Sequence, residues 1–204
     1  MDGLSPLLSI GSGHAELTAQ QPWLGALYEL LVQRGVRVLH HELRPGPGVD
    51  VAGDLTDARF LRELAEVAVR SVMCCNVLEH VPNPAQVAST IERLVVPGGY
   101  VLVSVPRRYP YHPGPIDTLF RPSVDELRRL FPSLTPTNTA EIQCESLLRY
   151  WLASPSKWTS LAHGSRLAAR RTGGPAFGGD LPFVETARMV LSSTAVSAVI
   201  LRHG

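Results

Sequence analysis

A glycine turn near the N-terminus is the first place where this sequence could bind a ligand. Leu7–Ile10 is a short apolar run typical of a buried strand, and Gly11-Ser12-Gly13 follows it directly. Glycine lets the backbone approach a ligand closely, and the start of a following helix offers unpaired N–H groups. The third small residue is Ala15 in place of glycine. The turn alone is therefore equally consistent with a tight structural turn and with a nucleotide-binding site.

Acidic residues follow the next two predicted strands. Glu42 comes at the end of the second strand, where a carboxylate can accept both hydroxyl protons of an adenosine ribose. Asp54 follows the third strand and is a candidate for the adenine edge, with Leu55 supplying its backbone N–H and an apolar wall. Capping of the next helix is the alternative role for Asp54, and it is the preferred role for Asp57.

These residues depend on strands that alternate with helices. The predicted strands cover residues 7–10, 36–39, 49–52, 71–77, 100–105 and 195–202, and the predicted helices cover residues 16–33 (interrupted at Pro22), 58–69, 84–94 and 124–131. Right-handed βαβ crossovers join such strands into a parallel sheet. The sequence therefore predicts an α/β fold, doubly wound, with a mostly parallel sheet of about seven strands and helices on both faces.

Length, charge and cysteine content exclude several classes of protein. The 204 residues, 45% of them hydrophobic, fit one domain over residues 1–204. With 19 basic and 18 acidic residues, we expect neither a nucleic-acid partner nor a membrane surface. The three cysteines have neither disulfide nor zinc spacing, so we expect reduced, buried thiols in a cytoplasmic protein. No secretion signal is visible, and no apolar run approaches the roughly 20 residues that cross a bilayer.

Three segments together resemble a known enzyme family. They are residues 7–13, residues 76–84 with the sequence Asn-Val-Leu-Glu-His-Val-Pro-Asn-Pro, and residues 94–106 around Pro97-Gly98-Gly99. At this spacing they resemble class I S-adenosylmethionine-dependent methyltransferases, above all the small-molecule branch called methyltransferase type 11. The resemblance covers about residues 5–131 and implies a Rossmann-like fold. A dehydrogenase rarely carries such a Leu-Glu-His-Val-Pro run before a Pro-Gly-Gly turn.

The resemblance also implies a role for individual residues. Gly11 and Gly13 would pass under the methionine part of S-adenosylmethionine, Glu42 would hold the ribose, and Asp54 would bind the adenine N6. Asn76 and the backbone of Val77 would line the cofactor near the reacting sulfonium. The implied cofactor-binding set is Gly11, Ser12, Gly13, Glu42, Asp54, Leu55, Asn76 and Val77. The Pro-Gly-Gly turn would be structural, and residues 1–106 would form the cofactor-binding half.

Residues 107–204 are expected to supply an acceptor loop, helices and closing strands. Tyr109, Tyr111, His112 and Asp117 would lie beyond the carboxyl ends of the strands, where open α/β sheets bind ligands. Methyl transfer from a sulfonium is an in-line displacement that mainly needs alignment of the acceptor. For a hydroxyl on a small-molecule acceptor, the preferred reading, a base must remove the proton. His112 is the preferred base and His80 the second candidate; a surface loop histidine is the alternative for His112.

Some relatives bind a divalent metal through a Glu-x-x-Glu-His run. Here Asn76 replaces the first glutamate, so we expect no metal, and Glu79 and His80 are expected to cap or pack at a helix start.

Two departures from the family pattern keep a second function open. Ser9 stands where the family usually has an acid that organises the glycine loop, although Glu16 is a candidate substitute. The chain also begins almost at the first strand, without the helices that usually cover the cofactor. A non-catalytic scaffold or partner subunit is therefore the alternative to an active enzyme, and an uncovered cleft makes a homodimer plausible.

Overall fold

The computed structural model describes residues 3–13, 22–109, 111, 116–146 and 193–204 of the chain. The strands in the described part are β1 (Leu7–Ile10), β2 (Val38–Glu42), β3 (Val51–Ala52), β4 (Ser71–Cys75), β5 (Tyr100–Arg108), β6 (Leu134–Ser146) and β7 (Ser193–His203). The helices are α2 (Pro22–Gln33), α3 (Ala58–Ala65), α4 (Pro84–Leu94) and α5 (Val124–Arg129), with a 3₁₀ turn η1 at Leu78–His80.

The seven strands form one sheet in the order β3-β2-β1-β4-β5-β7-β6. The pairs β1–β2, β1–β4, β2–β3 and β4–β5 are parallel. Ile10 at the end of β1 is level with His41 of β2 and with Cys74 of β4. The predicted doubly wound α/β fold is confirmed, and the register brings the carboxyl ends of the first strands to a common edge.

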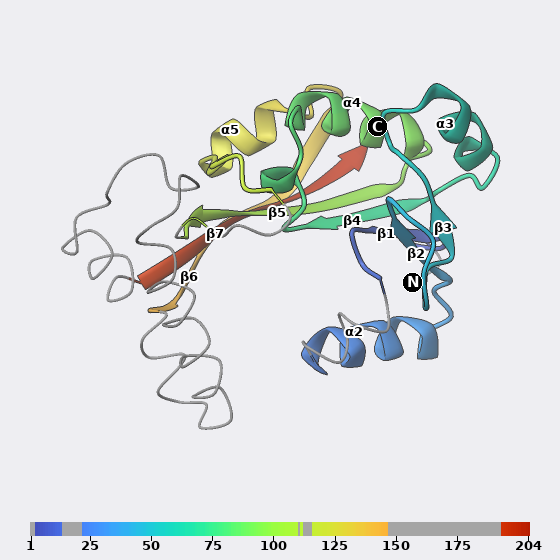
Figure 1. Cartoon of the computed structure of the whole chain (residues 1–204), viewed down its shortest axis with the longest axis horizontal. Helices are drawn as coiled ribbons and strands as arrows, with labels where there is room; N and C mark the ends of the chain where they lie inside the picture. Colours follow the sequence, from blue (N-terminus) through green and yellow to red (C-terminus); the bar gives the residue numbers. More distant parts are fainter. Residues whose placement is uncertain (1–2, 14–21, 110, 112–115, 147–192) are drawn as a thin grey trace, which may run out of the picture. The chain divides into compact units, whose positions relative to one another are not determined.

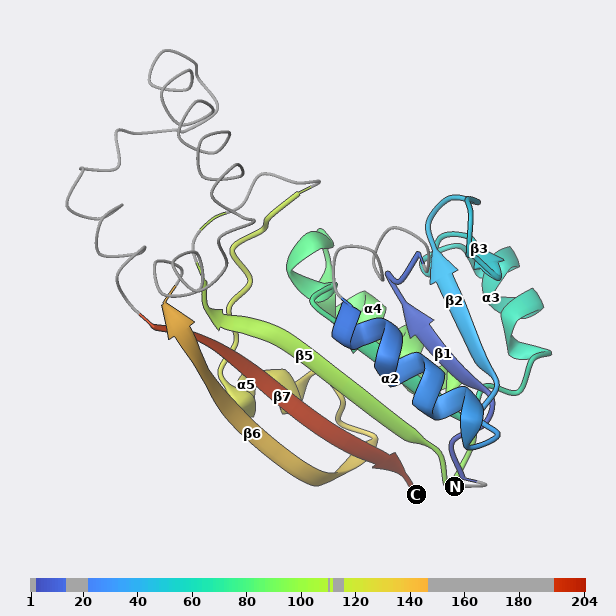
Figure 2. The same ribbon diagram turned by 90° about the horizontal axis from the view of Figure 1, so that it is seen from below.

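Helices cover both faces of the sheet. In Figure 1, α2 lies on one face and α3, α4 and α5 lie on the other; Figure 2 shows α2 in front of the sheet beside β1. The larger core cluster joins β1, β4, β5 and β7 to α3, α4 and α5, and includes Leu8, Val72, Val103 and Phe131. A smaller cluster joins Leu24 and Tyr28 of α2 to β1 and β4. Apolar side chains on both faces of the strands explain their continuous hydrophobic runs.

Two predicted helices begin at side-chain caps. The Asp57 carboxylate accepts hydrogen bonds from the N–H groups of Arg59 and Phe60 at the start of α3. Ser123 and Glu126 form a reciprocal capping box at the start of α5. The preferred capping role of Asp57 is therefore confirmed.

The predicted strand over residues 71–77 is too long. The strand β4 ends at Cys75, and Asn76 has a positive φ of 55°. Its N–H donates to the carbonyl of Ser104 at 2.9 Å, after which the chain turns into η1. A residue in the left-handed conformation cannot continue the extended backbone of a strand, so β4 ends before Asn76. Asparagine tolerates that conformation better than most residues.

Contacts divide the chain into two compact units. One comprises Met1–Arg107, Tyr111–Ile142 and Val196–Gly204, and the other comprises Arg108–Pro110 and Gln143–Ala195. The site residues discussed below belong to the first unit, except Tyr109, which belongs to the second. No helix in the described part of the chain is long and apolar enough to span a membrane.

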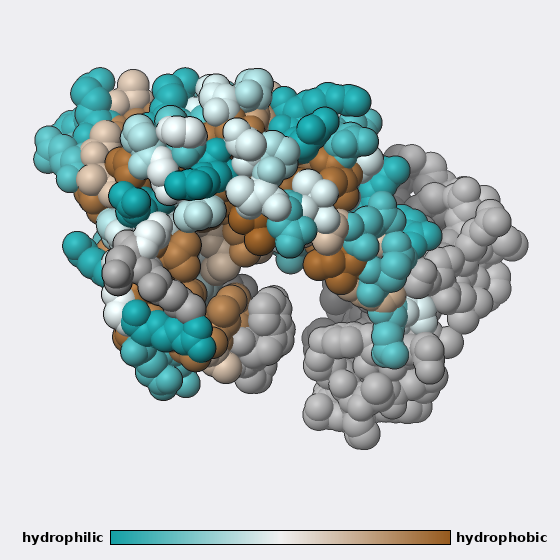
Figure 3. Space-filling view, turned by 180° about the vertical axis from the view of Figure 1, so that it is seen from behind, coloured by the Kyte–Doolittle hydropathy of each residue, from teal (hydrophilic) through white to brown (hydrophobic). Residues whose placement is uncertain are grey.

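The burial of one cysteine differs from the prediction. All three cysteines are free, as predicted, but Cys144 is exposed while Cys74 is buried. Cys144 lies among exposed residues of the edge strand β6. Its residue type alone therefore gave the wrong expectation of burial. Figure 3 shows apolar residues in several places between hydrophilic ones; the exposed apolar residues include Leu30 and Val32 of α2.

Candidate functional site

The glycine turn after β1 is held against the end of β2. The N–H groups of Gly11 and Ser12 both donate to the carbonyl of His41, at 2.9 and 3.3 Å. Gly11 has a φ of +69°, and a Cβ added there would come 2.7 Å from Cγ2 of Val77. The turn therefore needs glycine both for its conformation and for its close approach to the segment after β4.

Glu42 reaches from the end of β2 to the same turn. Its Oε1 accepts a hydrogen bond from the N–H of Gly13 at 2.9 Å. A Cβ on Gly13 would lie in ordinary contact with this side chain, 3.5 Å from Oε1. Glu42 is half-buried, and among the described residues only Oε1 of its carboxylate is hydrogen-bonded. A carboxylate beside a glycine turn suits a ligand that presents a pair of hydroxyl groups.

Asp54 and Leu55 follow β3 and point in different directions. Oδ1 of Asp54 accepts from the N–H and the hydroxyl of Thr56, at 2.8 and 2.7 Å, while the side chain stays exposed. Leu55 is 7% exposed and belongs to the main core, and its carbonyl accepts from the hydroxyl of Thr90 in α4. Oδ1 of Asp54 is thus bonded within its own turn, whereas the Leu55 side chain is largely used in packing.

Asn76 and Val77 complete the edge on the side of β4. Asn76 is exposed, and Val77 is half-buried against the main core cluster. Because Val77 also faces Gly11, the ends of β1, β2 and β4 bring together Gly11, Ser12, Gly13, Glu42 and Val77. This constellation is a glycine turn, a carboxylate and an apolar wall at the carboxyl edge of a parallel sheet.

The residues of this edge match a known family of protein domains. A profile of the methyltransferase domain matches residues 9–103, which run from β1 to β5 and contain the whole constellation. Over these residues the chain is similar to a family of methyltransferase domains. Its resemblance to the type 11 branch is thereby confirmed.

The curated relatives match about half of this chain. A ubiquinone biosynthesis O-methyltransferase of Paraburkholderia phytofirmans is 38% identical over 106 residues, covering 50% of this chain and 44% of the relative. One of Paracidovorax citrulli is 33% identical over 116 residues, covering 53% and 48%. The chain thus spans about half the length of the curated relatives that it matches.

Solved structures support the fold. A SAM-dependent methyltransferase from Archaeoglobus fulgidus superimposes with a TM-score of 0.52 at 13% identity, covering 98% of this chain and 86% of that one. A Haemonchus contortus phosphoethanolamine N-methyltransferase 2 gives a TM-score of 0.51 at 10% identity, covering 99% and 49%. At such identities the likeness concerns the arrangement of the sheet and helices alone.

Of the two predicted bases, only His80 belongs to the described part of the chain. His112 lies outside the described residues. The Nδ1 of His80 bonds the carbonyl of Ile116, and because a carbonyl only accepts, Nδ1 carries the proton. Its Nε2 lies 3.8 Å from Oε1 of Glu79, and 21% of the side chain is exposed. His80 is thus held between two protein groups of its own domain.

The segment after the expected acceptor loop is fixed to η1. The N–H and hydroxyl of Thr118 both donate to the carbonyl of Glu79, at 2.9 and 3.0 Å. The carboxylate of Asp117 pairs with the guanidinium of Arg121 at 2.6 Å, with no side-chain exposure at Asp117. Of the other predicted loop residues, Tyr109 is exposed and Tyr111 is half-buried. Asp117 therefore has a structural role, which its position in the sequence did not reveal.

Glu79 is a buried carboxyl group without a hydrogen-bond partner in the described part of the protein. Its side chain has no exposed surface, and neither Oε1 nor Oε2 is bonded. Burial raises the pKa of this carboxyl, an effect that the nearby charges of His80 and Arg121 oppose and that of Asp117 reinforces. The expected packing role of Glu79 thus comes with an electrostatic cost at neutral pH.

Replacing Glu79 with glutamine is expected to flatten part of the pH dependence of folding. The pKa of Glu79 is raised in the folded protein, so its contribution is full below the unfolded pKa and is lost as pH rises through the folded pKa. Urea unfolding from pH 4.5 to 8 should show the variant gaining on the wild type by roughly 1–3 kcal/mol toward the alkaline end. Exposed Glu63 changed to glutamine is the control. Parallel curves for wild type and Glu79→Gln would contradict the prediction.

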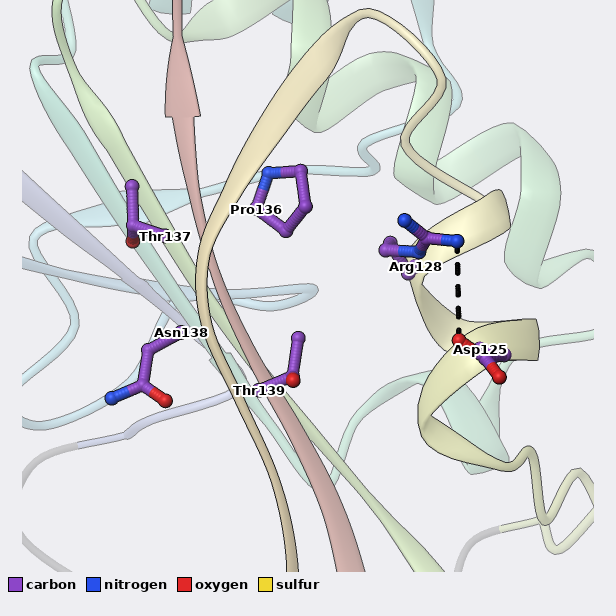
Figure 4. Close-up of a pocket in the computed structure, with 6 residues that line it drawn as sticks. All are labelled: Asp125, Arg128, Pro136, Thr137, Asn138 and Thr139. Atoms are coloured by element: carbon purple, nitrogen blue, oxygen red, sulfur yellow. Dashed lines mark ion pairs between the residues drawn. The ribbon is translucent and has the colours of Figure 1, made fainter.

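A separate cavity of about 290 Å³ lies between α5 and β6. Its lining is polar and includes an ion pair of 3.9 Å between Asp125 and Arg128 (Figure 4); the remaining lining residues are Pro136, Thr137, Asn138 and Thr139. Both members of the ion pair are largely exposed. The cavity contributes nothing to the edge that carries the glycine turn. Within the described residues, no three metal-ligating side chains converge.

Proposed function

We propose that this protein transfers a methyl group from S-adenosylmethionine to a hydroxyl group of a small molecule. The observation that carries the proposal is the contact between the Glu42 carboxylate and the N–H of Gly13, at 2.9 Å, beside a turn that only glycine fits. The names of the curated relatives, which are O-methyltransferases, support a hydroxyl acceptor.

The described residues fit the nucleoside and the methionine portions of this cofactor. Glu42 would accept hydrogen bonds from the ribose hydroxyls through Oε2, and Asp54 would accept one from the adenine amino group. Gly11 and Gly13 would leave room for the methionine portion, since a Cβ at Gly11 would fill the space in front of Val77. When bound, the sulfonium supplies an already activated methyl group.

The remaining task of the protein is to align the acceptor and remove its proton. His112 is the proposed base, because both ring nitrogens of His80 face groups of the protein. Ile116 and Thr118 are bonded to η1, so the end of the acceptor segment has a fixed anchor on the methyltransferase domain. A cytoplasmic location, a small-molecule acceptor, the absence of nucleic-acid and membrane partners, and a homodimer remain part of the proposal.

Replacing Glu42 with alanine tests the site. Calorimetric titration of the wild type should give micromolar binding of S-adenosylmethionine and S-adenosylhomocysteine, weakened roughly 10- to 30-fold in Glu42→Ala because charge-assisted hydrogen bonds to the ribose are lost. Exposed Glu63 changed to alanine should bind like the wild type. No binding by a folded wild type would refute the cofactor site.

The acceptor class is tested by transfer of a labelled methyl group. A panel of small phenols, catechols and alcohols should accept the label, and matched amines should not. Transfer to amines alone would refute the hydroxyl acceptor. Tight cofactor binding without transfer to any member of either panel would favour the alternative, a non-catalytic subunit.

A further inference from the structure

A chain of hydrogen bonds lies directly behind the glycine turn. The hydroxyl of Ser9 on β1 bonds that of Tyr28 on α2 at 2.8 Å. The hydroxyl of Ser12, inside the turn, donates to the carbonyl of Ser9 at 2.9 Å and lies 3.2 Å from Nδ1 of His40 on β2. All four side chains are buried, with residue exposures from 1% to 7%.

The protons in this network can be assigned. Ser12 has one hydroxyl proton, and the carbonyl of Ser9 takes it because a carbonyl can only accept. The oxygen of Ser12 is then an acceptor, so the proton between it and His40 belongs to Nδ1. The His40 ring is edge-on to Tyr28 at 4.7 Å between centroids, which fixes its plane.

The network joins three separate elements to one turn. Tyr28 belongs to α2, His40 to β2 and Ser9 to β1, and each bond ends at Ser9 or Ser12. Burial raises the pKa of the Tyr28 phenol, so the hydroxyl keeps its proton at neutral pH. The turn is therefore held from behind by buried groups, and hydrogen bonds in such surroundings orient groups firmly.

We propose that Tyr28 and His40 are positioning residues for the cofactor, holding the glycine turn through Ser9 and Ser12 in the shape that binds it. This inference rests on the proposed function of the turn. Neither residue forms part of the proposed contact surface; each acts through a serine. Ordering the turn before binding lowers the entropic cost of binding, so the network acts on affinity.

The test is a double-mutant cycle on affinity for S-adenosylhomocysteine. Tyr28→Phe and Ser9→Ala should each raise the Kd roughly five- to tenfold, the effect of one lost hydrogen bond. The double variant should be no worse than the weaker-binding single variant, because both changes break the same bond. Tyr100→Phe, on β5, is the matched control and should bind like the wild type.

A conservative exchange separates positioning from packing. His40→Asn keeps an N–H donor near the place of Nδ1 and should bind within about twofold of the wild type, while His40→Leu should lose roughly five- to tenfold. A Tyr28→Phe protein that melts lower but binds normally would overturn the inference, and so would additive effects of Tyr28 and Ser9. Failure of the folded wild type to bind would instead overturn the proposed function, and this inference with it.

Discussion

Gly11→Ala is expected to weaken the binding of S-adenosylhomocysteine roughly 100-fold or more. Gly11 has a φ of +69°, and the new Cβ would lie 2.7 Å from Cγ2 of Val77. Valine is stiff at χ1, so it cannot easily turn the methyl group away. To relieve the clash, either the glycine turn or Val77 must move, and both are proposed to face the cofactor. Calorimetric titration measures the loss directly.

Gly35→Ala is the matched control for this change. Gly35 also has a positive φ, +79°, but nothing lies within 4 Å of the Cβ that would be added. The alanine should therefore cost about 1–2 kcal/mol of stability through backbone strain, as at Gly11, while the Kd stays at its wild-type value. Wild-type binding by Gly11→Ala would contradict the proposed site, and an equal loss by Gly35→Ala would trace the effect to stability.

The sequence predicted the parts of the site that follow strands. Glu42 comes directly after an apolar run, and a parallel sheet must bring such residues to one edge. The glycine turn was found for the same reason. That Glu42 bonds the N–H of Gly13 depends on the register of β1 and β2 and on a side-chain rotamer, neither of which periodicity determines.

The network behind the turn could not be predicted. Tyr28 occupies an apolar stripe of its helix and would be assigned to the core by its type and spacing alone. Its hydroxyl reaches Ser9 only because α2 packs across β1 at one particular rotation. The sequence showed that Ser9 replaces the acid usual in the family. It did not show that Tyr28 would be the hydrogen-bond partner of Ser9, because no sequence pattern links the two residues.

The strand β6 was missed for a different reason. Of its 13 residues only Leu134 and Ser146 are buried, and the residues between them are exposed. An edge strand of this kind lacks the alternation of apolar and polar residues by which strands are recognised. Its pairing is decided by the neighbouring β7, far away in the sequence.

Gly99→Ala is expected to destabilise the fold by roughly 3 kcal/mol or more, or to prevent folding. A Cβ on Gly99 would lie 2.1 Å from the carbonyl oxygen of Arg70 and 2.9 Å from that of Val96. Neither oxygen belongs to a flexible side chain. The carbonyl of Arg70 also accepts the N–H of Tyr100 at 3.1 Å, which pairs the starts of β4 and β5. The clash can be relieved only by pulling these two central strands apart.

The adjacent glycine separates this clash from backbone strain. Gly98 has a φ of +80°, but its nearest outside atom would be the Arg70 side chain, at 3.7 Å from an added Cβ. Gly98→Ala should therefore cost only about 1–2 kcal/mol. Urea unfolding of both variants measures the difference, and equal losses would show that Gly99 is not confined by the Arg70 carbonyl. Because Pro97-Gly98-Gly99 is far along the chain from the glycine turn, Gly98→Ala should also leave the Kd for S-adenosylhomocysteine unchanged, which makes the turn structural, as the family resemblance implied.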